Sequence, residues 1–466
     1  EDWGGGRSGH SSTLVHGGLV DLSRIGVRAV AALRRERDLL LDRTAPHLVR
    51  RVPLLVPLTH GLPERLAVGA GLALYDAAAY SIRQPGVLPG HRQLARRAVR
   101  RLAPSVAITD VTGAVQLYEA QVDDARLTVT VVRTAAAYGA LVRSRTPVRG
   151  LLVEHDRVVG VEVEDPAGGR MPLRARAVVL AAGASTSALL PGHATAQAAA
   201  GGRIESIHLV VPRGRIRSST GLVLRSGEHV VYVVPWGRHW IVGSTAAWSE
   251  PDRLLSDLNR HLEVPLGLDA VESSFSTPAR WGSDGDRSPA VAVPVPALVT
   301  VHGGGLAGYR AEAERAIDLA VAQIGGLHPP STTRRVPLLG ADGFEARWNQ
   351  RHLLAERAAV PVLRMEHLLR RYGSDVDSLI SALEERPQLA APLPGAEDYL
   401  AAEVWFAVAY EGATHLDDVL QRRTRIAIET RDGGAEATGA VAELMAADLD
   451  WDDQERSRQI SRYLNP

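Results

Sequence analysis

Two apolar runs that each end in glycine most constrain the fold of this 466-residue chain. The first covers residues 177–182 and is followed by Gly183; the second covers residues 291–301 and is followed by His302 and three glycines. We expect each run to be a buried strand of a parallel sheet whose C-terminal end meets a ligand. An amphipathic helix is predicted directly afterwards, over residues 312–324. The runs therefore indicate an α/β domain.

The stretch between the two runs has a different pattern. Four β-rich segments alternate in the antiparallel manner and predict a separate sheet, at residues 207–211, 221–224, 230–234 and 240–242. A hairpin is predicted earlier, over residues 150–164, with a third strand after the turn at residues 166–169. An α/β domain interrupted by an antiparallel sheet is the simplest arrangement that accommodates both patterns.

Helical periodicity dominates the rest of the chain. It predicts helices over residues 22–49, 63–80 and 124–138, with short strands at residues 54–56 and 139–142. The pair Pro329-Pro330 predicts a linker, and the charged, helical composition beyond it predicts an all-helical C-terminal domain. We therefore place a domain boundary between residues 330 and 331.

The charge balance and residue usage exclude several functions. The 53 basic and 53 acidic side chains cancel, so no global field attracts nucleic acid. Cysteine is absent, which excludes disulfides and thiolate chemistry, and every basic residue other than histidine is arginine, which excludes Schiff-base catalysis. No apolar run is long enough to span a membrane and no signal peptide is visible, so we expect a cytoplasmic chain whose opening at Glu1 marks a fragment.

Two glycine phrases are candidate ligand sites. Ser11 and Ser12 precede His16-Gly17-Gly18 just ahead of a helix, where hydroxyls and bare amides fit a phosphate or the edge of a flavin. The alternative is an ordinary N-capped helix. Gly303 and Gly304 follow a strand and let a cofactor approach the backbone closely, although a flexible turn is the alternative.

Single side chains in the β-rich block are less specific. His208 lies in an alternating strand, where it is either a base or a hydrogen-bonded structural residue. The tryptophans at positions 236 and 240 are typical of a core or a turn.

His415 with Asp417 and Asp418 has no spacing that fits a metal, so no metal site is predicted.

The order of several motifs resembles the FAD-dependent glycerol-3-phosphate dehydrogenases. The strongest is Ser-Ser-Thr-Leu-Val-His-Gly-Gly-Leu-Val at residues 11–20, close to the phrase that lies against the isoalloxazine ring in that family. Similar family motifs follow in the same order along nearly the whole chain, at residues 122–127, 181–183, 208–212, 234–236, 303–310, 338–343 and 371–373.

The resemblance implies an FAD-binding Rossmann-like domain over residues 1–330. It implies a β-rich substrate domain inserted at roughly 50–110 and 203–280, and an α-helical cap at 331–466. It assigns catalysis to His208, near the reacting hydroxyl, and to Arg310, on the phosphate. It assigns FAD binding to Glu1, Ser11, Ser12, Leu14, His16, Gly17, Gly18, Val148, Gly183, Gly303 and Gly304.

The same resemblance implies an activity and partners. A member of this family would oxidise the phosphorylated polyol sn-glycerol 3-phosphate to dihydroxyacetone phosphate and pass the electrons to a quinone. Such a role belongs to glycerol metabolism in the cytoplasm. It allows peripheral contact with the inner face of the membrane and a homodimer.

The chain departs from the family at two places. Its opening glycine-rich βα unit is not in the sequence, and Val20, Thr277 and Gly305 stand where the family has cations for the phosphate. Three lost charge-assisted bonds would remove roughly 4–9 kcal/mol of phosphate binding. Two alternatives therefore stay open: a degenerate member that does not bind flavin, and a flavin oxidase of a non-phosphorylated substrate.

Overall fold

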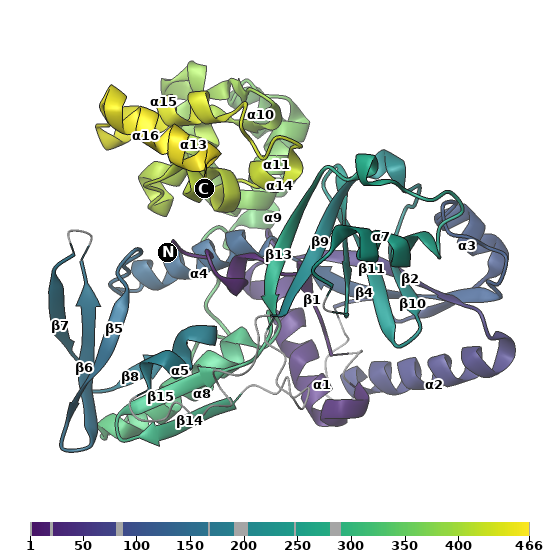
Figure 1. The fold of residues 1–466 in the computed structure, drawn as a ribbon, viewed down its shortest axis with the longest axis horizontal. Coiled ribbons are helices and arrows are strands. Elements are labelled where there is room, and N and C mark those ends of the chain that lie inside the picture. The colour runs from purple at the N-terminus through teal and green to yellow at the C-terminus, as the bar shows by residue number, and fades with distance from the viewer. Residues whose placement is uncertain are drawn as a thin grey trace.

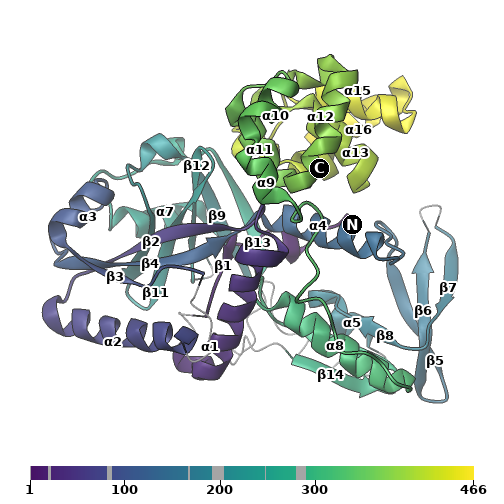
Figure 2. The ribbon, with the colours of Figure 1, turned by 180° about the vertical axis from the view of Figure 1, so that it is seen from behind.

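A computed structural model describes residues 2–18, 22–80, 87–165, 168–190, 204–246, 248–279 and 290–465. The C-terminal helices lie on one side of the molecule, above both a large twisted sheet and a smaller α/β region (Figures 1 and 2). Helix α4 (Asp124–Ala137) runs beneath the C-terminal helices, close to the N-terminus.

The large sheet has nine strands among the described residues. Its path is β1-β4-β2-β10-β11-β12-β9-β13, with β3 also paired to β4, and only β2 and β10 are parallel neighbours. The strands are β1 (Leu14–Val15), β2 (Arg50–Leu58), β3 (Arg92–Ala95), β4 (Gly113–Gln121), β9 (Ile204–Pro212), β10 (Gly221–Ser226), β11 (His229–Trp236), β12 (His239–Ser244) and β13 (Ser273–Ala279).

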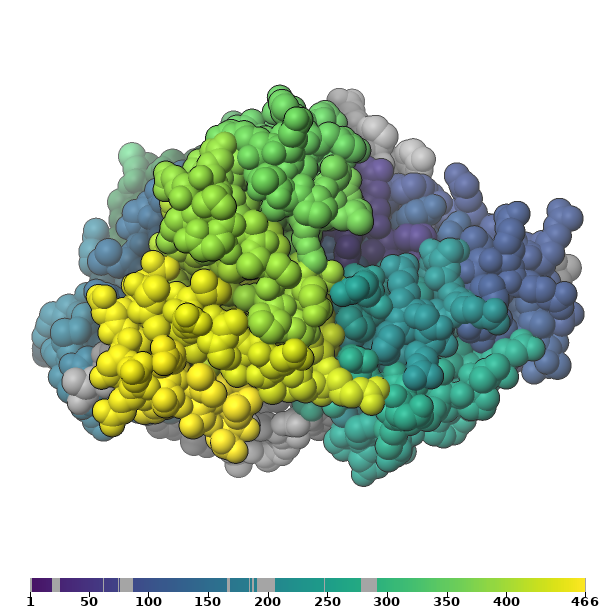
Figure 3. All heavy atoms as spheres, turned by 90° about the horizontal axis from the view of Figure 1, so that it is seen from above, coloured from purple at the N-terminus to yellow at the C-terminus, as the bar shows by residue number. Residues whose placement is uncertain are grey.

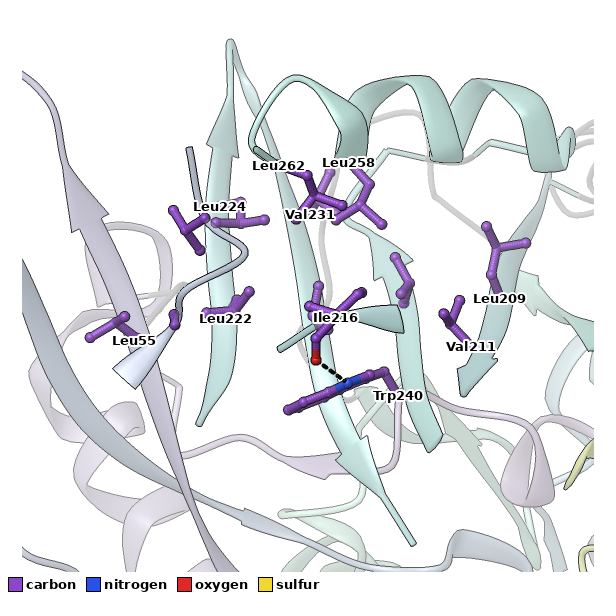
Figure 4. Close-up of a cluster of buried hydrophobic side chains, with 14 of the residues drawn as sticks. Leu55, Leu209, Val211, Ile216, Leu222, Leu224, Val231, Trp240, Leu258 and Leu262 are labelled. Carbon is purple, nitrogen blue, oxygen red and sulfur yellow. Dashed lines mark hydrogen bonds between the residues drawn. The ribbon is translucent and has the colours of Figure 1, made fainter. Parts of the chain in front are cut away.

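One face of this sheet forms the largest apolar core. Alternate residues of β9 to β12 point into it, and α3 (Arg96–Leu102) and α7 (Pro251–Asn259) contribute Val99 and Leu258. Trp240 belongs to this core, is fully buried and donates its indole hydrogen to the Ile216 carbonyl over 3.0 Å (Figure 4). The remaining side chains of each strand point to the opposite face of the sheet, so the strand sequences also determine the residues on that face.

A second, smaller sheet has the parallel character that the apolar runs predict. Strand β8 (Val178–Leu180) lies parallel to β15 (Leu298–His302), and β14 (Ala290–Val295) completes the sheet. Helix α8 (Tyr309–Ile324) covers it through Ala316 and Ala320. A separate three-stranded meander stands at its edge, formed by β5 (Val148–Glu154), β6 (Arg157–Glu164) and β7 (Arg170–Arg174).

Two helices before β4 frame the lower side of the large sheet. Helix α1 (Leu22–Leu39) contains a break at Gly26, where φ is 76°, and continues into a π-helical turn over Leu40–Thr44. Helix α2 (Gly61–Tyr80) packs against α1.

The described residues after 331, referred to below as the C-terminal domain, are mainly helical. Viewed from above, this domain covers the top of the molecule beside the teal strands of the large sheet (Figure 3). Its longer helices are α11 (Val362–Tyr372), α12 (Val376–Glu385), α13 (Ala401–Glu411), α15 (Thr438–Leu449) and α16 (Asp453–Leu464), and a short hairpin of β16 (Pro392–Leu393) and β17 (Ala396–Leu400) interrupts them.

The structure confirms the predicted arrangement, an α/β region interrupted by a β-rich sheet and followed by a helical region. The domain boundaries remain a prediction. The nine-stranded sheet includes β1 and β4, which lie outside the ranges 50–110 and 203–280.

Several local predictions were wrong. Residues 139–142 are a turn and loop rather than a strand: Gly139, with φ at 92°, ends α4, and Leu141 is left fully exposed. Residues 291–301 contain two antiparallel strands, because the chain reverses at Pro296-Ala297. The predicted helix over residues 22–49 ends at Leu39, before the π-helical turn.

The strand predicted at residues 54–56 is longer and spans Arg50–Leu58. Its prolines, Pro53 and Pro57, are tolerated because the register with β10 covers only Leu54 and Leu55 on that side. No helix in the described ranges has both the length and the apolar character needed to cross a membrane.

Candidate active site

The second face of the nine-stranded sheet carries a group of polar side chains among apolar ones such as Val234 and Ile241. Residues paired in register share a face, so the strand alternation that buries Leu209 and Val233 turns their neighbours to the opposite side. That face carries Glu119, Gln121, His208, Tyr232, Trp236 and Thr277. A row of polar side chains on a largely buried surface marks a candidate functional site.

His208 lies on this polar face, on the next-to-last strand β9, and is 3% exposed. Its Nε2 lies 2.7 Å from the Tyr232 hydroxyl, its Nδ1 lies 3.4 Å from the Thr277 hydroxyl, and its ring stacks on Phe275. Burial lowers the pKa of His208 to about 4. The imidazole is therefore neutral at neutral pH and able to accept a proton.

A glycine makes the contact between Tyr232 and His208 possible. Gly243 faces Tyr232 across the β11–β12 register, and a Cβ at this position would lie 2.5 Å from the Tyr232 ring atom Cζ. The tyrosine side chain therefore lies across the glycine toward β9. Burial raises the pKa of Tyr232 above its usual range, and the Ser12 side chain hydrogen-bonds to its hydroxyl.

The phrase at residues 11–18 lies over the same face. Thr13, with φ at 62°, accepts a hydrogen bond from Gln121 Nε2 over 3.0 Å, and the Gly17 amide donates to Glu119 Oε2 over 3.1 Å. Between these contacts Leu14 pairs with β4. The structure thus brings Ser12, Leu14 and Gly17 onto the polar face, while the His16 side chain is exposed.

A buried ion pair supports this phrase from behind. Arg37 donates to Glu119 over 2.9 Å and to the Tyr75 hydroxyl over 3.1 Å. A Cβ on Gly17 would lie 2.5 Å from Arg37 Nη1 and would overlap the Tyr75 hydroxyl. Only glycine allows the backbone to lie this close to the buried pair.

The other glycine turns gather at the ends of β8 and β15. Because these strands are parallel and paired, Gly183 and Gly303 follow them at the same edge, both with positive φ. Leu33 of α1 lies against both Gly18 and Gly308, at 3.2 and 3.5 Å from where a Cβ would stand on each. The two predicted glycine phrases are therefore close neighbours around α1.

Arg310 lies on α8, away from His208, in a dense ion-pair cluster. Its guanidinium donates to Glu36 over 2.6 and 2.7 Å, to Glu314 over 2.6 Å and to Thr333 over 2.9 Å. The hydrogen bond with Glu36 is the main reason that its pKa is raised. Two carboxylates thus already compensate the charge predicted to hold a phosphate.

Three other positions named from the sequence lie in different surroundings. Gly304 lies against the carboxylate of Glu312, whose pKa burial raises to about 7. Val148 begins β5 and is 37% exposed, apart from the residues around Ser12. Thr277 lies beside His208, where it offers a hydroxyl rather than a positive charge. Glu1 and Val20 lie outside the described residues.

Sequence reasoning missed Tyr232, Glu119 and Gln121. The usable signal was the strand alternation itself: in β4 the polar residues Glu119 and Gln121 share the parity of Leu117, which predicts that they point to one face. Nothing local indicates that this face is covered by residues 11–18. The contact depends on the pairing of β1 with β4, more than a hundred residues along the chain.

The glycine edge fits the flavin that the resemblance implies. No protein atom of the described chain lies within 4 Å of where a Cβ would stand on Gly183 or Gly305, so their backbone borders open space. The buried Thr186 hydroxyl, just after Gly183, has no hydrogen-bond partner in the described part of the chain. Open glycine backbone and a free buried hydroxyl at parallel strand ends are typical of a nucleotide cofactor site.

Two family models match the chain. The model described as FAD dependent oxidoreductase matches residues 1–309, and the C-terminal domain of alpha-glycerophosphate oxidase matches residues 331–456. Together they cover both the two-sheet part and the helical domain.

Relatives and a solved structure agree with these matches. Glycerol-3-phosphate dehydrogenase of Mycobacterium leprae is 37% identical, over 99% of this chain and 82% of the relative. Glycerol-3-phosphate dehydrogenase 2 of Mycobacterium tuberculosis is 38% identical over the same shares. The fold is similar to glycerol-3-phosphate dehydrogenase from Bacillus halodurans complexed with FAD, with a TM-score of 0.75, 20% identity and coverage of 99% of this chain and 87% of that one.

The polar sheet face and the glycine edge thus lie in the part that the first family model matches, and the C-terminal helices lie mostly in the part that the second one matches. The chain belongs to the FAD-dependent oxidoreductases, as a member of the glycerol-3-phosphate dehydrogenase family.

Proposed function

We propose that this chain oxidises carbon 2 of sn-glycerol 3-phosphate to dihydroxyacetone phosphate. The names of relatives that are 37% and 38% identical over nearly the whole chain support this activity. The structural observation that carries it is the placing of Ser12 against Tyr232, and of Tyr232 against His208, on one sheet face. A flavin-facing phrase and a neutral base are thereby held side by side.

His208 supplies the proton acceptor in this proposal. Oxidation of an alcohol to a ketone releases the hydroxyl proton and transfers the hydrogen of carbon 2 with two electrons. FAD, when bound, accepts that hydrogen and electron pair. The imidazole of His208 takes the hydroxyl proton, because burial keeps it neutral at neutral pH.

The residues assigned to FAD remain part of the proposal. Ser11, Ser12, Leu14, His16, Gly17 and Gly18 would line the flavin ring, and Gly183, Gly303 and Gly304 would approach the cofactor through their backbone. The assignment of Glu1 and Val148 to the nucleotide end rests on the resemblance alone.

Arg310 is the proposed phosphate ligand, but its guanidinium is already paired with two carboxylates. A phosphate dianion reaching Arg310 would have to replace Glu36 or Glu314, each now within 2.6 Å of the guanidinium. Binding at this position would therefore require the carboxylates to move away or to take up protons.

The electron acceptor and cellular setting belong to the proposal as well. We infer a quinone as the acceptor, a place in glycerol metabolism at the cytoplasmic side, and contact with the inner membrane face. A homodimer is compatible with this role.

A second candidate is oxidation of a non-phosphorylated substrate by the same face. The observation in its favour is the pairing of Arg310 with two carboxylates, together with an uncharged Thr277 beside His208. A neutral hydroxyl substrate needs no positive charge at Arg310 or at position 277.

Anaerobic titration of the purified chain, reconstituted with FAD, separates these functions. Bleaching of the flavin by sn-glycerol 3-phosphate at concentrations that leave it yellow with glycerol supports the phosphorylated substrate. Bleaching by glycerol or another uncharged alcohol alone supports the second candidate. A chain that retains no flavin through gel filtration contradicts both.

A further inference from the structure

An arginine of the C-terminal domain contacts the chain just before residues 11–18, the segment proposed to line the flavin. Arg425 is 4% exposed and lies in the chain between a π-helical turn and helix α14 (Ile426–Glu429). Its Nη1 donates to the Gly9 carbonyl over 3.0 Å, its Nε donates to Asp123 over 2.9 Å, and its Nη2 donates to Asp124. Three nitrogens of one guanidinium thus hold three groups of the N-terminal part.

Asp124 connects Arg425 to Ser11, because its two carboxylate oxygens each bond one of these residues. Its Oδ2 accepts a hydrogen bond from the Ser11 amide over 2.6 Å, while its Oδ1 faces Arg425. Ser12 follows directly and hydrogen-bonds to Tyr232, which contacts His208. A continuous series of contacts therefore runs from the C-terminal domain to the histidine of the proposed reaction.

The segment before Ser11 is fixed by the same domain. Asp2 accepts from Arg422 over 2.8 Å and from Arg423 over 2.5 and 2.9 Å. The Trp3 ring lies against Gly412, at 3.0 Å from where a Cβ would stand. Asp2 and Trp3 thus contact the C-terminal domain, and the N-terminus lies beneath its helices (Figure 1).

The chemistry of arginine suits this task. Its planar fork donates in several fixed directions at once, whereas a lysine ammonium is a point charge without that geometry. A guanidinium that is almost wholly buried and bonded to two aspartates and a carbonyl has little freedom to shift. The atoms that it holds are correspondingly fixed.

We propose that Arg425 is a positioning residue: through Gly9 and Asp124 it sets the backbone of Ser11 and Ser12 against Tyr232. This inference rests on the proposed function for its catalytic consequence, but the geometry exists in the chain without cofactor or substrate. Beyond covering the sheet, the C-terminal domain thereby shapes the site at which His208 acts.

The test compares Arg425→Gln with Arg145→Gln. Arg145 also joins the two parts of the chain, through a 2.5 Å ion pair with Asp418, but it has no described contact with residues 9–18. The first readout is hydrogen exchange of the amides at residues 11–18 in the full chain without added flavin. The second is kcat and KM for sn-glycerol 3-phosphate in the FAD-loaded chain.

We expect Arg425→Gln to speed exchange at residues 11–18 by roughly tenfold or more and to lower kcat by a similar factor, with little change in KM. Arg425→Lys should fall between this variant and the wild type. Arg145→Gln should lower the melting temperature while leaving both readouts near the wild-type values. Equal effects of the two glutamine variants would reduce Arg425 to a purely structural contact and overturn the proposal.

Two further arms keep the test decisive. If Arg425→Gln does not fold, Asp124→Asn is measured in the same way, since it keeps the side-chain shape and removes the charge that faces Arg425. Unchanged exchange at residues 11–18 in Asp124→Asn would refute the proposal. A wild-type chain without glycerol-3-phosphate activity would refute the proposed function instead, and the exchange measurement would still judge the role of Arg425.

Discussion

The Nε2 atom of His208 lies 2.7 Å from the hydroxyl oxygen of Tyr232, on the polar face of the nine-stranded sheet. This contact joins β9 to β11 across β12, and it is shorter than the 3.4 Å contact of Nδ1 with Thr277. The tyrosine therefore helps to fix the orientation of the imidazole ring.

Replacing Tyr232 with phenylalanine should lower kcat by roughly 10- to 100-fold with little effect on KM. The change leaves Nε2 of His208 buried without its partner, which should also cost about 1–3 kcal/mol of stability. Steady-state kinetics and urea unfolding measure the two effects. Tyr410→Phe is the control, because Tyr410 lies on α13 and is 47% exposed. An unchanged kcat in Tyr232→Phe would remove the tyrosine from the mechanism.

Gly243→Ala should displace Tyr232 without changing any polar group. The new methyl group would lie about 2.5 Å from ring atom Cζ, so the tyrosine must turn away from His208. We expect kcat to fall by roughly tenfold. Gly439→Ala is the matched control: outside its own helix, no atom of the described residues lies within 4 Å of its Cβ position in α15, and alanine there should stabilise the chain by up to about 1 kcal/mol. Full activity in Gly243→Ala would show that the ring position is unimportant.

His208 should make stability fall as the solution becomes acidic. Burial lowers its pKa to about 4 from an ordinary 6.5, so the folded chain binds this proton less readily than the unfolded chain. The contribution is complete above pH 6.5 and is lost as the pH falls through 4, amounting to up to about 3 kcal/mol. His208→Asn should flatten this part of the pH dependence of urea unfolding. His60→Asn, at a side chain that is 83% exposed, should not.

Glu312 should act in the opposite direction. Burial raises its pKa to about 7 from an ordinary 4.5, so its contribution is complete below pH 4.5 and is lost as the pH rises through 7. We expect Glu312→Gln to be more stable than the wild type at pH 8, by on the order of 1 kcal/mol after solvent screening, and equal to it at pH 4.5. Unfolding of the flavin-free chain at both pH values measures this. Glu314→Gln, which loses an ion pair with Arg310, should gain nothing at pH 8.

The parts of the fold set by local patterns were predictable. Alternation identified β9 to β12, and the apolar stripe over residues 124–138 identified α4, because both signals repeat within a few residues. The phrase at residues 11–18 was recognised in the same way, as a run of consecutive residues. Its position over Tyr232 was not predictable, because it depends on the pairing of β1 with β4.

Long-range ion pairs were the least predictable feature. Arg310 was expected to face a phosphate, yet Glu36, 274 residues earlier, holds its guanidinium. No periodicity links the two residues, and the family resemblance concerns Arg310 rather than its partner. The sequence alone therefore does not reveal which opposite charge pairs with a charged residue, and this pairing decides whether the residue is free to bind a ligand.

The bonds of Asp2 set an order of events during synthesis. Its partners, Arg422 and Arg423, lie 420 and 421 residues later. A ribosome adding about 5–20 residues per second delivers them roughly 20–80 seconds after the aspartate. Until then Asp2 lacks these two counter-charges, so its contacts with Arg422 and Arg423 form only after residues 422 and 423 have been made.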